Sequence, residues 1–568
     1  MIITIDKKKI SCEDGKSVLE VARDNKIDVP ALCYHPDLKI KGNCRMCLIE
    51  IKGRPGLHTS CSIKAETGMQ ISTATPTINK ARKINLELLF GQHRVECADC
   101  LLEHKCELLR LAKIYKVNIN RFKNRKAKLK TYKFGPSIEF DSSKCIDCLN
   151  CIEVCKKQEV NFFEIKKIDN INRVLPTCDK NRDCIYCGQC ITHCPVGAIE
   201  AVGEFEDSQK PLAPKNKTIV FQFAPSIRAS IGEEFGLAAG SIVTDQLAAA
   251  IRALGVSKVF DVSLGADFTT VEEAKELVER LSQKKNLPMF TSCCPAWVKF
   301  IEFYYPEFIP NLTTVRSPHI ISGGLIKTYW AEKENINPKD IYVISVMPCT
   351  AKKHEITRPQ VRIKGLNPVD HVLTTRELAH LFKKNKINLA NIKGEAADSP
   401  LGEHSGAGVI YGASGGVMES ALRTAYTQIC GSKLSKIDFK EVRGLQGFKK
   451  ANIKIKDNIV KVAVVNGMFE AKILLEELKQ NPQAYDYIEF MACTGGCIGG
   501  GGQPVPVNSK TREARAKGLY SIDTKKKIRV AHDNPALKEI YKSYLTDKHI
   551  IHKICHTTFN KKKREVKI

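Results

Sequence analysis

The chain has 568 residues, 24 cysteines and a formal net charge of +27. That length exceeds what one hydrophobic core usually supports, so we expect several domains. Disulfide scaffolds are typical of short secreted chains, whereas repeated C-x2-C spacings in a long chain favour thiolates bound to metal. The N-terminus enters a strand pattern without a signal or transit peptide, and no stretch of about 18 apolar residues occurs. A cytoplasmic, reducing location is therefore expected, and secreted or membrane-spanning classes are disfavoured.

Two basic runs, at 121–133 and 561–568, add to the positive charge. Neither has a recognisable nucleic-acid motif or regularly spaced aromatic residues, so we expect solvated or disordered faces and no nucleic-acid or membrane binding. Iron-sulfur clusters with thiolate ligands are anionic and would lower the net charge by roughly ten units. The remaining charge predicts long-range attraction of an acidic partner.

Residues 1–78 combine apolar alternation at 1–5, 47–51 and 69–73 with one helical pattern at 17–25, which predicts a small β-grasp ferredoxin module. Its four cysteines follow C-x10-C-x2-C-x13-C: Cys33, Cys44, Cys47 and Cys61. This spacing resembles the 2Fe-2S module of multi-cluster hydrogenases and of the large iron-sulfur subunit of respiratory complex I. A four-cysteine zinc site is the alternative, and the presence of only one close pair disfavours it.

Residues 79–125 are mostly helical in pattern and contain H-x3-C-x2-C-x5-C, formed by His93, Cys97, Cys100 and Cys106. The same two families place a 4Fe-4S cluster with one imidazole ligand at this arrangement. Neutral imidazole removes one negative charge relative to thiolate and should raise the cluster potential, as suits electron entry or storage. A zinc site with three thiolates and one imidazole stays open.

Residues 126–208 contain C-x2-C-x2-C-x3-C twice, at Cys145, Cys148, Cys151 and Cys155 and at Cys184, Cys187, Cys190 and Cys194. The duplication resembles bacterial two-cluster ferredoxins. That resemblance implies a crossover, in which Cys194 joins the first three cysteines of the first run and Cys155 joins those of the second. Lys156 stands where a proline usually follows the first run, and Cys178 is a spare thiol.

A Pro- and Lys-containing linker at 207–217 precedes the C-terminal domain, which we place at 209–568 with its basic tail. Strand-like runs at 218–224, 258–263, 342–348, 462–467 and 487–493 alternate there with helical patterns, which predicts parallel sheets flanked by helices. The cysteine motifs lie mostly where strands end, and α/β sheets usually bind ligands there.

Three cysteine-bearing segments, at 291–297, 347–355 and 489–504, resemble the motifs that hold the catalytic cluster of iron-only (FeFe) hydrogenases. The resemblance implies four ligands of a 4Fe-4S cluster: Cys294, Cys349, Cys493 and Cys497. It further implies that Cys497 bridges to a two-iron subsite with CO, cyanide and azadithiolate, completing an H-cluster. The adjacent glycines allow tight turns around a bulky group. A phosphate loop is disfavoured because neither Lys-Ser/Thr nor a helical pattern follows.

The resemblance assigns Cys293 as proton donor and Lys352 as the residue that holds a cyanide ligand. The alternatives are an inert buried thiol and an exposed lysine. It also implies a proton path through Glu273, Glu276, Arg280 and Thr313. The first three share one helical face, a pattern that alone is more often a solvated face with ion pairs, and Thr313 replaces the serine of many relatives.

Five further positions match those around the cofactor, where they would exclude water and tune the site: Pro225, Ser226, Met347, Met491 and Gln503. His319 and Thr494 depart from the family motifs without removing a ligand. Cys12, Cys430 and Cys555 fit no motif, and we interpret them as structural or incidental.

Taken together, the resemblance implies a clostridial-type ferredoxin hydrogenase of mixed, multidomain α+β and α/β fold. It would carry one 2Fe-2S cluster, three accessory 4Fe-4S clusters and an H-cluster, and interconvert protons, electrons and H2 in anaerobic hydrogen metabolism. Expected partners are ferredoxin and maturation proteins, with a monomeric chain. The alternatives are a non-catalytic iron-sulfur carrier or assembly factor, and a hydrogen-sensing or electron-bifurcating subunit.

Overall fold

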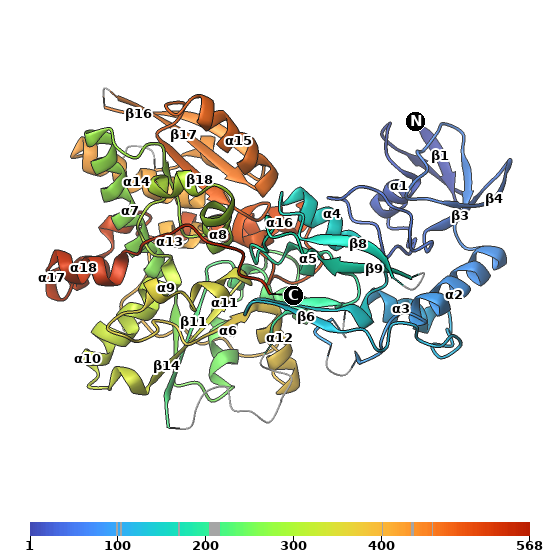
Figure 1. Cartoon of the computed structure of the whole chain (residues 1–568), viewed down its shortest axis with the longest axis horizontal. Coiled ribbons are helices and arrows are strands. Elements are labelled where there is room, and N and C mark those ends of the chain that lie inside the picture. The colour runs from blue at the N-terminus through green and yellow to red at the C-terminus, as the bar shows by residue number, and fades with distance from the viewer. Residues whose placement is uncertain are drawn as a thin grey trace.

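The computed structural model of the protein describes residues 1–97, 100–102, 105–168, 171–203, 216–399, 401–432, 437–456 and 458–567. The predicted linker at 207–217, except for its last two residues, and the predicted boundary at 208–209 lie outside this range. Figure 1 shows the N-terminal elements at one end of the molecule, the two-motif segment in the middle and the C-terminal sheets at the other end. The C-terminal end of the chain returns to the middle.

The first module is a five-stranded sheet in the order β2-β1-β5-β3-β4 that packs on one helix. Its elements are β1 (Ile2–Ile5), β2 (Lys8–Ser11), α1 (Val18–Asp24), β3 (Leu48–Ile51), β4 (Arg54–Thr59) and β5 (Gln70–Ser72). The β1–β5 pair is parallel and the other pairs are antiparallel. Ser17 and Glu20 form a capping box that begins α1. Strands and a helix therefore occur where the alternation predicts them.

Two helices follow, α2 (Pro76–Phe90) and α3 (Glu107–Ile114), and lead into the two-motif segment. That segment has a three-stranded sheet, a hairpin and two short helices: β6 (Thr131–Phe134), β7 (Ile138–Asp141), α4 (Asn150–Lys157), β8 (Phe163–Ile168), β9 (Ile171–Pro176), α5 (Gln189–Thr192) and β10 (Ile199–Ala201). Each copy of the cysteine motif continues into a short helix, α4 in the first and α5 in the second.

The C-terminal domain contains two four-stranded sheets. One has the order β12-β11-β14-β15 and is fully parallel, with β11 (Thr218–Phe223), β12 (Lys258–Asp261), β14 (Ile341–Met347) and β15 (His371–Thr374). The other has the order β13-β18-β17-β16, with β13 (Met289–Phe290), β16 (Phe448–Ile455), β17 (Asn458–Asn466) and β18 (Tyr487–Met491). The edge strand β16 is antiparallel to β17, so the prediction of purely parallel sheets is wrong at that edge.

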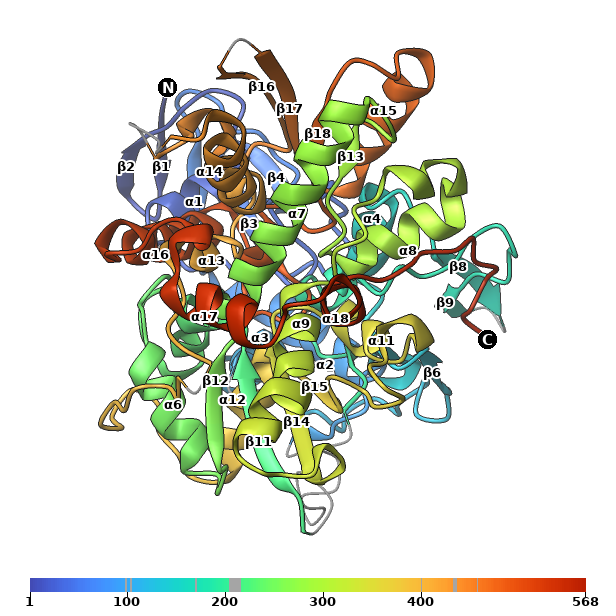
Figure 2. The same cartoon turned by 90° about the vertical axis from the view of Figure 1, so that its left-hand side faces the viewer.

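Helices surround the two sheets, as the view along the long axis shows (Figure 2). They are α6 (Thr244–Arg252), α7 (Ser263–Gln283), α8 (Pro295–Tyr304), α9 (Pro318–Leu325), α10 (Ala331–Lys333), α11 (Ala351–Glu355), α12 (Thr375–Lys384), α13 (Gly406–Ile410), α14 (Gly416–Cys430), α15 (Met468–Gln480), α16 (Ser509–Lys525), α17 (Pro535–Ser543) and α18 (Lys548–Cys555). α16 begins at Ser509 and not directly after Gly502, so no helix starts at the glycine-rich segment as a phosphate loop would require.

Most side chains of the two basic runs are exposed or half-buried, as expected of solvated faces, but each run also has fixed residues. In the first, Lys126 is buried and donates hydrogen bonds to the carbonyl of Cys145 and to Asp147. In the second, the guanidinium of Arg564 donates to backbone carbonyls of the two-motif segment, and Val566 is buried. The second run therefore joins the tail to the two-motif segment, whereas most of the first run is exposed, as expected.

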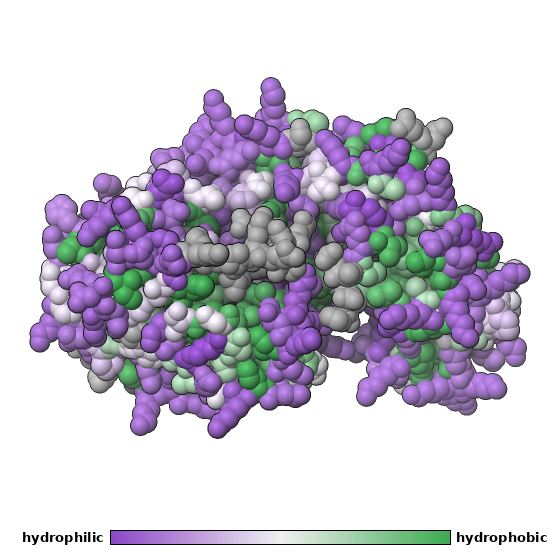
Figure 3. All heavy atoms as spheres, turned by 90° about the horizontal axis from the view of Figure 1, so that it is seen from below, coloured by the Kyte–Doolittle hydropathy of each residue, from purple (hydrophilic) through white to green (hydrophobic). Residues whose placement is uncertain are grey.

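No described helix is long and apolar enough to cross a membrane. The face seen from below carries mostly hydrophilic side chains with apolar ones between them (Figure 3).

A buried ion pair fastens the second cysteine run to the C-terminal domain. Lys299 of α8 lies 2.8 Å from Asp183, and both side chains are almost fully buried. Asp183 also accepts hydrogen bonds from the backbone N–H of Cys184 and of Glu565. This carboxylate therefore joins a cluster motif, α8 and the C-terminal tail.

We expect Lys299→Met to destabilise this docking by about 3–5 kcal/mol, because Asp183 would remain buried without its cation. The measurement is the midpoint of thermal unfolding together with the visible absorbance of the clusters. Lys472→Met is the matched control, because the Lys472–Glu159 pair also joins the two parts but is more exposed, and such pairs contribute about 0–1 kcal/mol. Equal midpoints in the two variants would contradict the assignment.

Candidate functional site

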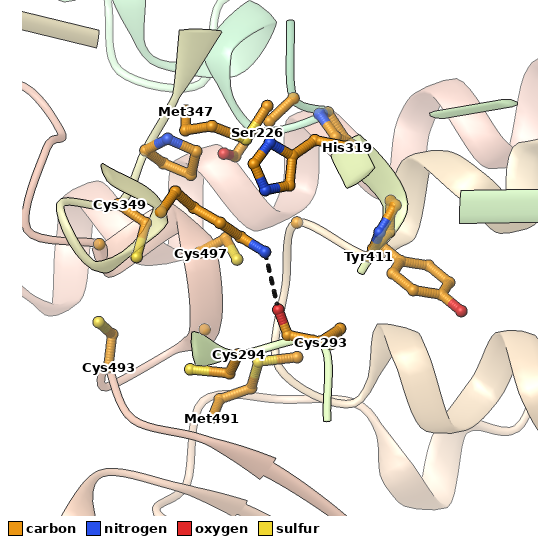
Figure 4. A pocket seen from close by; sticks show the side chains of 18 of the residues that line it. Ser226, Cys293, Cys294, His319, Met347, Cys349, Tyr411, Met491, Cys493 and Cys497 are labelled. Carbon is orange, nitrogen blue, oxygen red and sulfur yellow. Dashed lines mark hydrogen bonds between the residues drawn. The ribbon is translucent and has the colours of Figure 1, made fainter. Parts of the chain in front are cut away.

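Four thiols border one buried cavity between the two sheets of the C-terminal domain. They belong to Cys294, Cys349, Cys493 and Cys497, and the cavity has a volume of about 80 Å³. Figure 4 shows these side chains around the cavity, with Cys293 and Met491 beside them. The thiols follow β13, β14 and β18 in the chain, so the ends of parallel strands bring them together.

Burial dominates the electrostatics of these thiols. It raises the pKa of Cys349 and of Cys497 to about 12, and each also feels the neighbouring thiols. The pKa of Cys493 is raised well above its ordinary value for the same reasons. Such thiols stay protonated in the free protein and become thiolates when a metal supplies compensating charge.

The turn between Cys493 and Cys497 depends on two glycines. Gly495 and Gly496 have φ of +81° and +83°, in the left-handed region that favours glycine. Thr494, the departure from the family motif, precedes them and is not among the residues that line the cavity.

Lys352 and His319 share one carboxylate at the cavity wall. The Lys352 ammonium donates to Glu355 at 2.7 Å and to the Cys293 carbonyl at 3.0 Å, and His319 Nε2 lies 2.7 Å from the same Glu355 oxygen. Burial opposes the charge of Lys352, but the Glu355 carboxylate raises the pKa of this lysine. Burial and the Lys352 charge lower the pKa of His319, so its neutral ring donates to Glu355. His319, which departs from the family motif, thus helps to fix Lys352 through the shared Glu355 carboxylate.

The cavity also has an unsatisfied donor. Ser226 lines it, and its buried hydroxyl has no hydrogen-bond partner among the described residues. Pro225, Met347 and Met491 line the cavity as well. Gln503 does not: its side-chain amide donates to the Cys497 carbonyl at 3.1 Å. The wall is therefore mostly apolar, with a free hydroxyl, as suits a bulky group that accepts hydrogen bonds.

The predicted proton path has an inner and an outer part. In the inner part, Cys293 lines the cavity and the Glu273 carboxyl accepts a hydrogen bond from the Tyr487 hydroxyl at 3.0 Å. Burial raises the pKa of Glu273 to about 8 and that of Cys293 well above its ordinary value. Both groups are therefore mainly neutral and able to donate protons at neutral pH.

In the outer part, Glu276 lies between Arg280 and Thr313. The Arg280 guanidinium donates to one carboxylate oxygen at 2.5 Å, and the Thr313 hydroxyl donates to the other at 2.8 Å. Arg280 also donates to the carbonyl of Leu312, which fixes α7 against the segment that carries Thr313.

The first module brings its four cysteines into two close pairs. The Cys44 N–H lies 3.5 Å from the Cys33 sulfur, and the Cys47 and Cys61 sulfurs are 3.3 Å apart. Two pairs of thiols are the set that two iron ions in a 2Fe-2S cluster require.

His93 is oriented for metal binding through Nε2. Its Nδ1 lies 2.7 Å from the Lys144 carbonyl, which can only accept, so Nδ1 carries the proton and Nε2 is free. Burial also lowers the pKa of His93, which keeps the ring neutral. Cys97, Cys100 and Cys106 are partly buried, and burial raises the pKa of Cys100 to about 11.

The two repeated motifs approach each other as a crossover requires. Cys194 is among the groups that act electrostatically on Cys145, Cys148 and Cys151 of the first run. Cys155 does the same for the second run, at Cys184, Cys187 and Cys190. Cys178 is exposed and belongs to neither group.

Two backbone segments meet between the second run and the cavity. A Cβ atom on Gly501 would lie 2.5 Å from the Cys187 carbonyl oxygen, so only glycine fits there. The Thr350 hydroxyl donates to the Tyr186 carbonyl at 2.7 Å, and the Gln189 side chain donates to the Gly499 carbonyl at 3.0 Å. The loop that carries Cys187 is thereby held against the glycine-rich segment.

Sequence reasoning missed Glu355, Tyr487 and Tyr411. Glu355 could have been found, because it follows Lys352 by three residues in a helical motif. Tyr487 and Tyr411 come from β18 and from the end of α13, and they contact α7 residues only after folding. No local pattern marks them.

Comparison with known proteins gives the family. Residues 217–501 match the C-terminal domain of the iron-only hydrogenase large subunit, and residues 509–562 match the iron hydrogenase small subunit. Residues 1–76 match a 2Fe-2S cluster-binding domain, and residues 144–198 match a 4Fe-4S dicluster domain. The chain belongs to the iron-only hydrogenases. It is therefore a multidomain iron-sulfur oxidoreductase of hydrogen metabolism with an H-cluster domain.

Two similar proteins align over nearly the whole chain, and a similar solved structure aligns over part of it. The NADP-reducing hydrogenase subunit HndD of Solidesulfovibrio fructosivorans is 37% identical and covers 99% of both chains. Iron hydrogenase 1 of Clostridium pasteurianum is 38% identical, covering 95% of this chain and 96% of its own. The solved structure of an [FeFe]-hydrogenase HydA1 from Chlamydomonas reinhardtii is 38% identical, with a TM-score of 0.56, and covers 62% of this chain and 97% of its own.

The pKa of Glu273 predicts an infrared titration. The carboxyl is neutral below about pH 8 and ionised above it, so its C=O stretch should fade as the pH rises through that value. The folded state then holds a proton that an unfolded chain releases near pH 4.5, so Glu273 lowers stability increasingly between these values. Glu273→Gln should lack both the band and this stability loss. A band that persists unchanged in the variant would contradict the assignment.

Proposed function

We propose that the chain catalyses the reversible reduction of protons to H2 with electrons from reduced ferredoxin. The observation that carries this proposal is the convergence of four buried or half-buried thiols, the additional thiol of Cys293 and the Lys352 ammonium on one cavity. A structural cluster would need only the four thiols. The other two groups are suited to proton donation and to binding an anionic ligand.

The cavity residues fit an H-cluster. Cys294, Cys349, Cys493 and Cys497 would hold its 4Fe-4S part, with Cys497 shared with the two-iron subsite. When bound, this cofactor supplies the redox chemistry that interconverts two protons and two electrons with H2. Lys352, fixed by Glu355, would donate to a cyanide ligand.

The other residues around the cavity have supporting tasks. Ser226 would donate its free hydroxyl to the bound cofactor, and Pro225, Met347 and Met491 would keep water out. Gln503 would fix the backbone of Cys497 through its hydrogen bond to that carbonyl.

Protons would pass between the cavity and the surface along the path described above. Cys293 holds the proton nearest the cavity, and Glu273 is the buried neutral carboxyl behind it. Thr313, Glu276 and Arg280 form the outer part. In this order the buried groups donate protons, and only the outer carboxylate lies near solvent.

Electrons would reach the cavity through four accessory clusters in three modules. These are a β-grasp 2Fe-2S domain at 1–78, a His93-ligated 4Fe-4S domain at 79–125 and a two-cluster ferredoxin-like domain at 126–208, before the catalytic domain at 209–568. The Cys187–Gly501 contact supports transfer from the second cysteine run to the catalytic thiols. A monomeric chain, a cytoplasmic location and insertion of the cofactor by maturation proteins complete the proposal.

A second candidate is a subunit of an NADP-reducing enzyme, because a relative of that name aligns with 99% of this chain. A non-catalytic carrier or assembly factor is disfavoured, since such a protein would not need Cys293 and Lys352 at the cavity. The electron donor therefore separates the leading alternatives.

We expect the purified, matured protein to evolve H2 from reduced ferredoxin without added subunits, and not from NADPH. The rate should fall as ionic strength rises, because a basic chain attracts an acidic carrier over long range. Reduced methyl viologen, a small cationic donor, is the control, whose rate should not fall. Turnover with NADPH alone, or a ferredoxin rate insensitive to salt, would contradict the ferredoxin proposal.

A further inference from the structure

The C-terminal segment lies over the outer end of the predicted proton path. α18 packs against α7 and α9, as Figure 2 shows. His556, directly after α18, forms an antiparallel bridge with Val315, and the Thr557 N–H donates to the Thr314 carbonyl at 2.8 Å. Backbone contacts therefore fix His556 beside the segment that carries Thr313.

Hydrogen bonds connect His556 with Glu276. The hydroxyls of Thr313 and Thr314 both donate to the same Glu276 oxygen, at 2.8 and 3.0 Å. The Thr314 hydroxyl oxygen also lies 2.8 Å from Nδ1 of His556. Because the single hydroxyl hydrogen of Thr314 is directed at the carboxylate, Nδ1 is the donor in this arrangement. His556, Thr314 and Glu276 thus form a row of hydrogen bonds, which runs from the imidazole N–H through the Thr314 hydroxyl to the Glu276 carboxylate.

The other side of the imidazole faces an anion. Nε2 of His556 lies 3.3 Å from the Glu272 carboxylate. Burial alone would raise the pKa of Glu272, but the hydrogen bond from His556 and the charge of Lys275 lower it to about 2. Tyr541 also donates to this carboxylate. Glu272 is therefore ionised at neutral pH and stabilises a protonated imidazole.

Two further side chains lie beside the same ring or its backbone. The His552 and His556 rings stack with their centroids 5.6 Å apart, and the Arg316 side chain donates to the His556 carbonyl. The His556 side chain is 15% exposed, and Thr314 is exposed. Solvent therefore reaches both.

We propose that His556 relays protons between solvent and Glu276, which rests on the proposed proton path through Glu276. In the inward step, the imidazolium releases its Nδ1 proton to the Thr314 hydroxyl, which passes its own proton to the Glu276 carboxylate. One N–H bond breaks, one carboxyl O–H bond forms, and water reprotonates the neutral imidazole. The segment that matches the hydrogenase small subunit thus supplies part of the path.

The test uses the matured full-length enzyme with reduced methyl viologen, which takes the ferredoxin proposal out of the measurement. His556→Ala and His556→Gln remove the titrating ring, and the second keeps a hydrogen-bonding side chain. His549→Gln is the matched control, because this exposed histidine of α18 lies outside the row. Iron content and the midpoint of thermal unfolding verify that each variant is folded and loaded.

We expect both His556 variants to evolve H2 about tenfold more slowly, the loss expected of a removed proton relay that water replaces in part. Added imidazole should restore much of the rate of His556→Ala, which a merely structural role would not allow. After a pH jump without electron donor, the infrared bands of the CO and cyanide ligands should also respond more slowly. His549→Gln should behave as wild type.

If His556→Ala had the rates and pH-jump responses of the wild type while Glu276→Gln was slow, only the role of His556 would be overturned. If Glu276→Gln also evolved H2 as fast as the wild type, the proposed proton path itself would be wrong. No H2 from a fully loaded wild-type enzyme would instead overturn the proposed function, so the failures are distinguishable.

Discussion

The proposed electron path of this hydrogenase depends on a contact between two backbones. Gly501 packs against the Cys187 carbonyl so closely that any side chain would collide with it, and Gln189 and Thr350 add hydrogen bonds across the same contact. Gly495 and Gly496 form the turn before Cys497, and the run of four glycines after Cys497 lets the neighbouring cysteine motif approach. This approach matters because electron transfer weakens steeply with distance.

Burial is the second constraint, because it raises the pKa of cavity thiols and of Glu273 in the proposed proton path. Thiols in the cavity have raised pKa values, so they form thiolates only with a compensating metal charge. The same low polarity keeps Glu273 protonated near neutral pH, as suits a proton donor. Charges that must stay ionised have buried partners instead, such as Lys352 with Glu355 and Lys299 with Asp183. The apolar interior thus raises the pKa of Glu273 and of several cavity thiols, and the ion pairs keep the buried charges ionised.

Sequence alone could predict the ligands because their information is local. The spacing within each cysteine motif, and the strand that precedes Cys349 or Cys493, lie within a few residues of each other. The partner of Glu273, Tyr487, is 214 residues away, and His556 is 242 residues from Thr314, so no pattern connects them. The edge strand β16 was missed although its sequence alternates. The basic tail packs because Lys299 and Asp183 form hydrogen bonds with its residue Glu565, and these partners are distant in the sequence.

The central claim is that the cavity is a catalytic centre and not a structural cluster. The most direct measurement is H2 evolution from reduced viologen by protein matured anaerobically, with its CO and cyanide bands recorded by infrared spectroscopy. We predict rapid evolution by the wild type and its loss in Cys293→Ala at equal iron and ligand content, with Cys178→Ala, an exposed thiol, unaffected. Fully loaded wild-type protein that evolves no H2 would contradict the account.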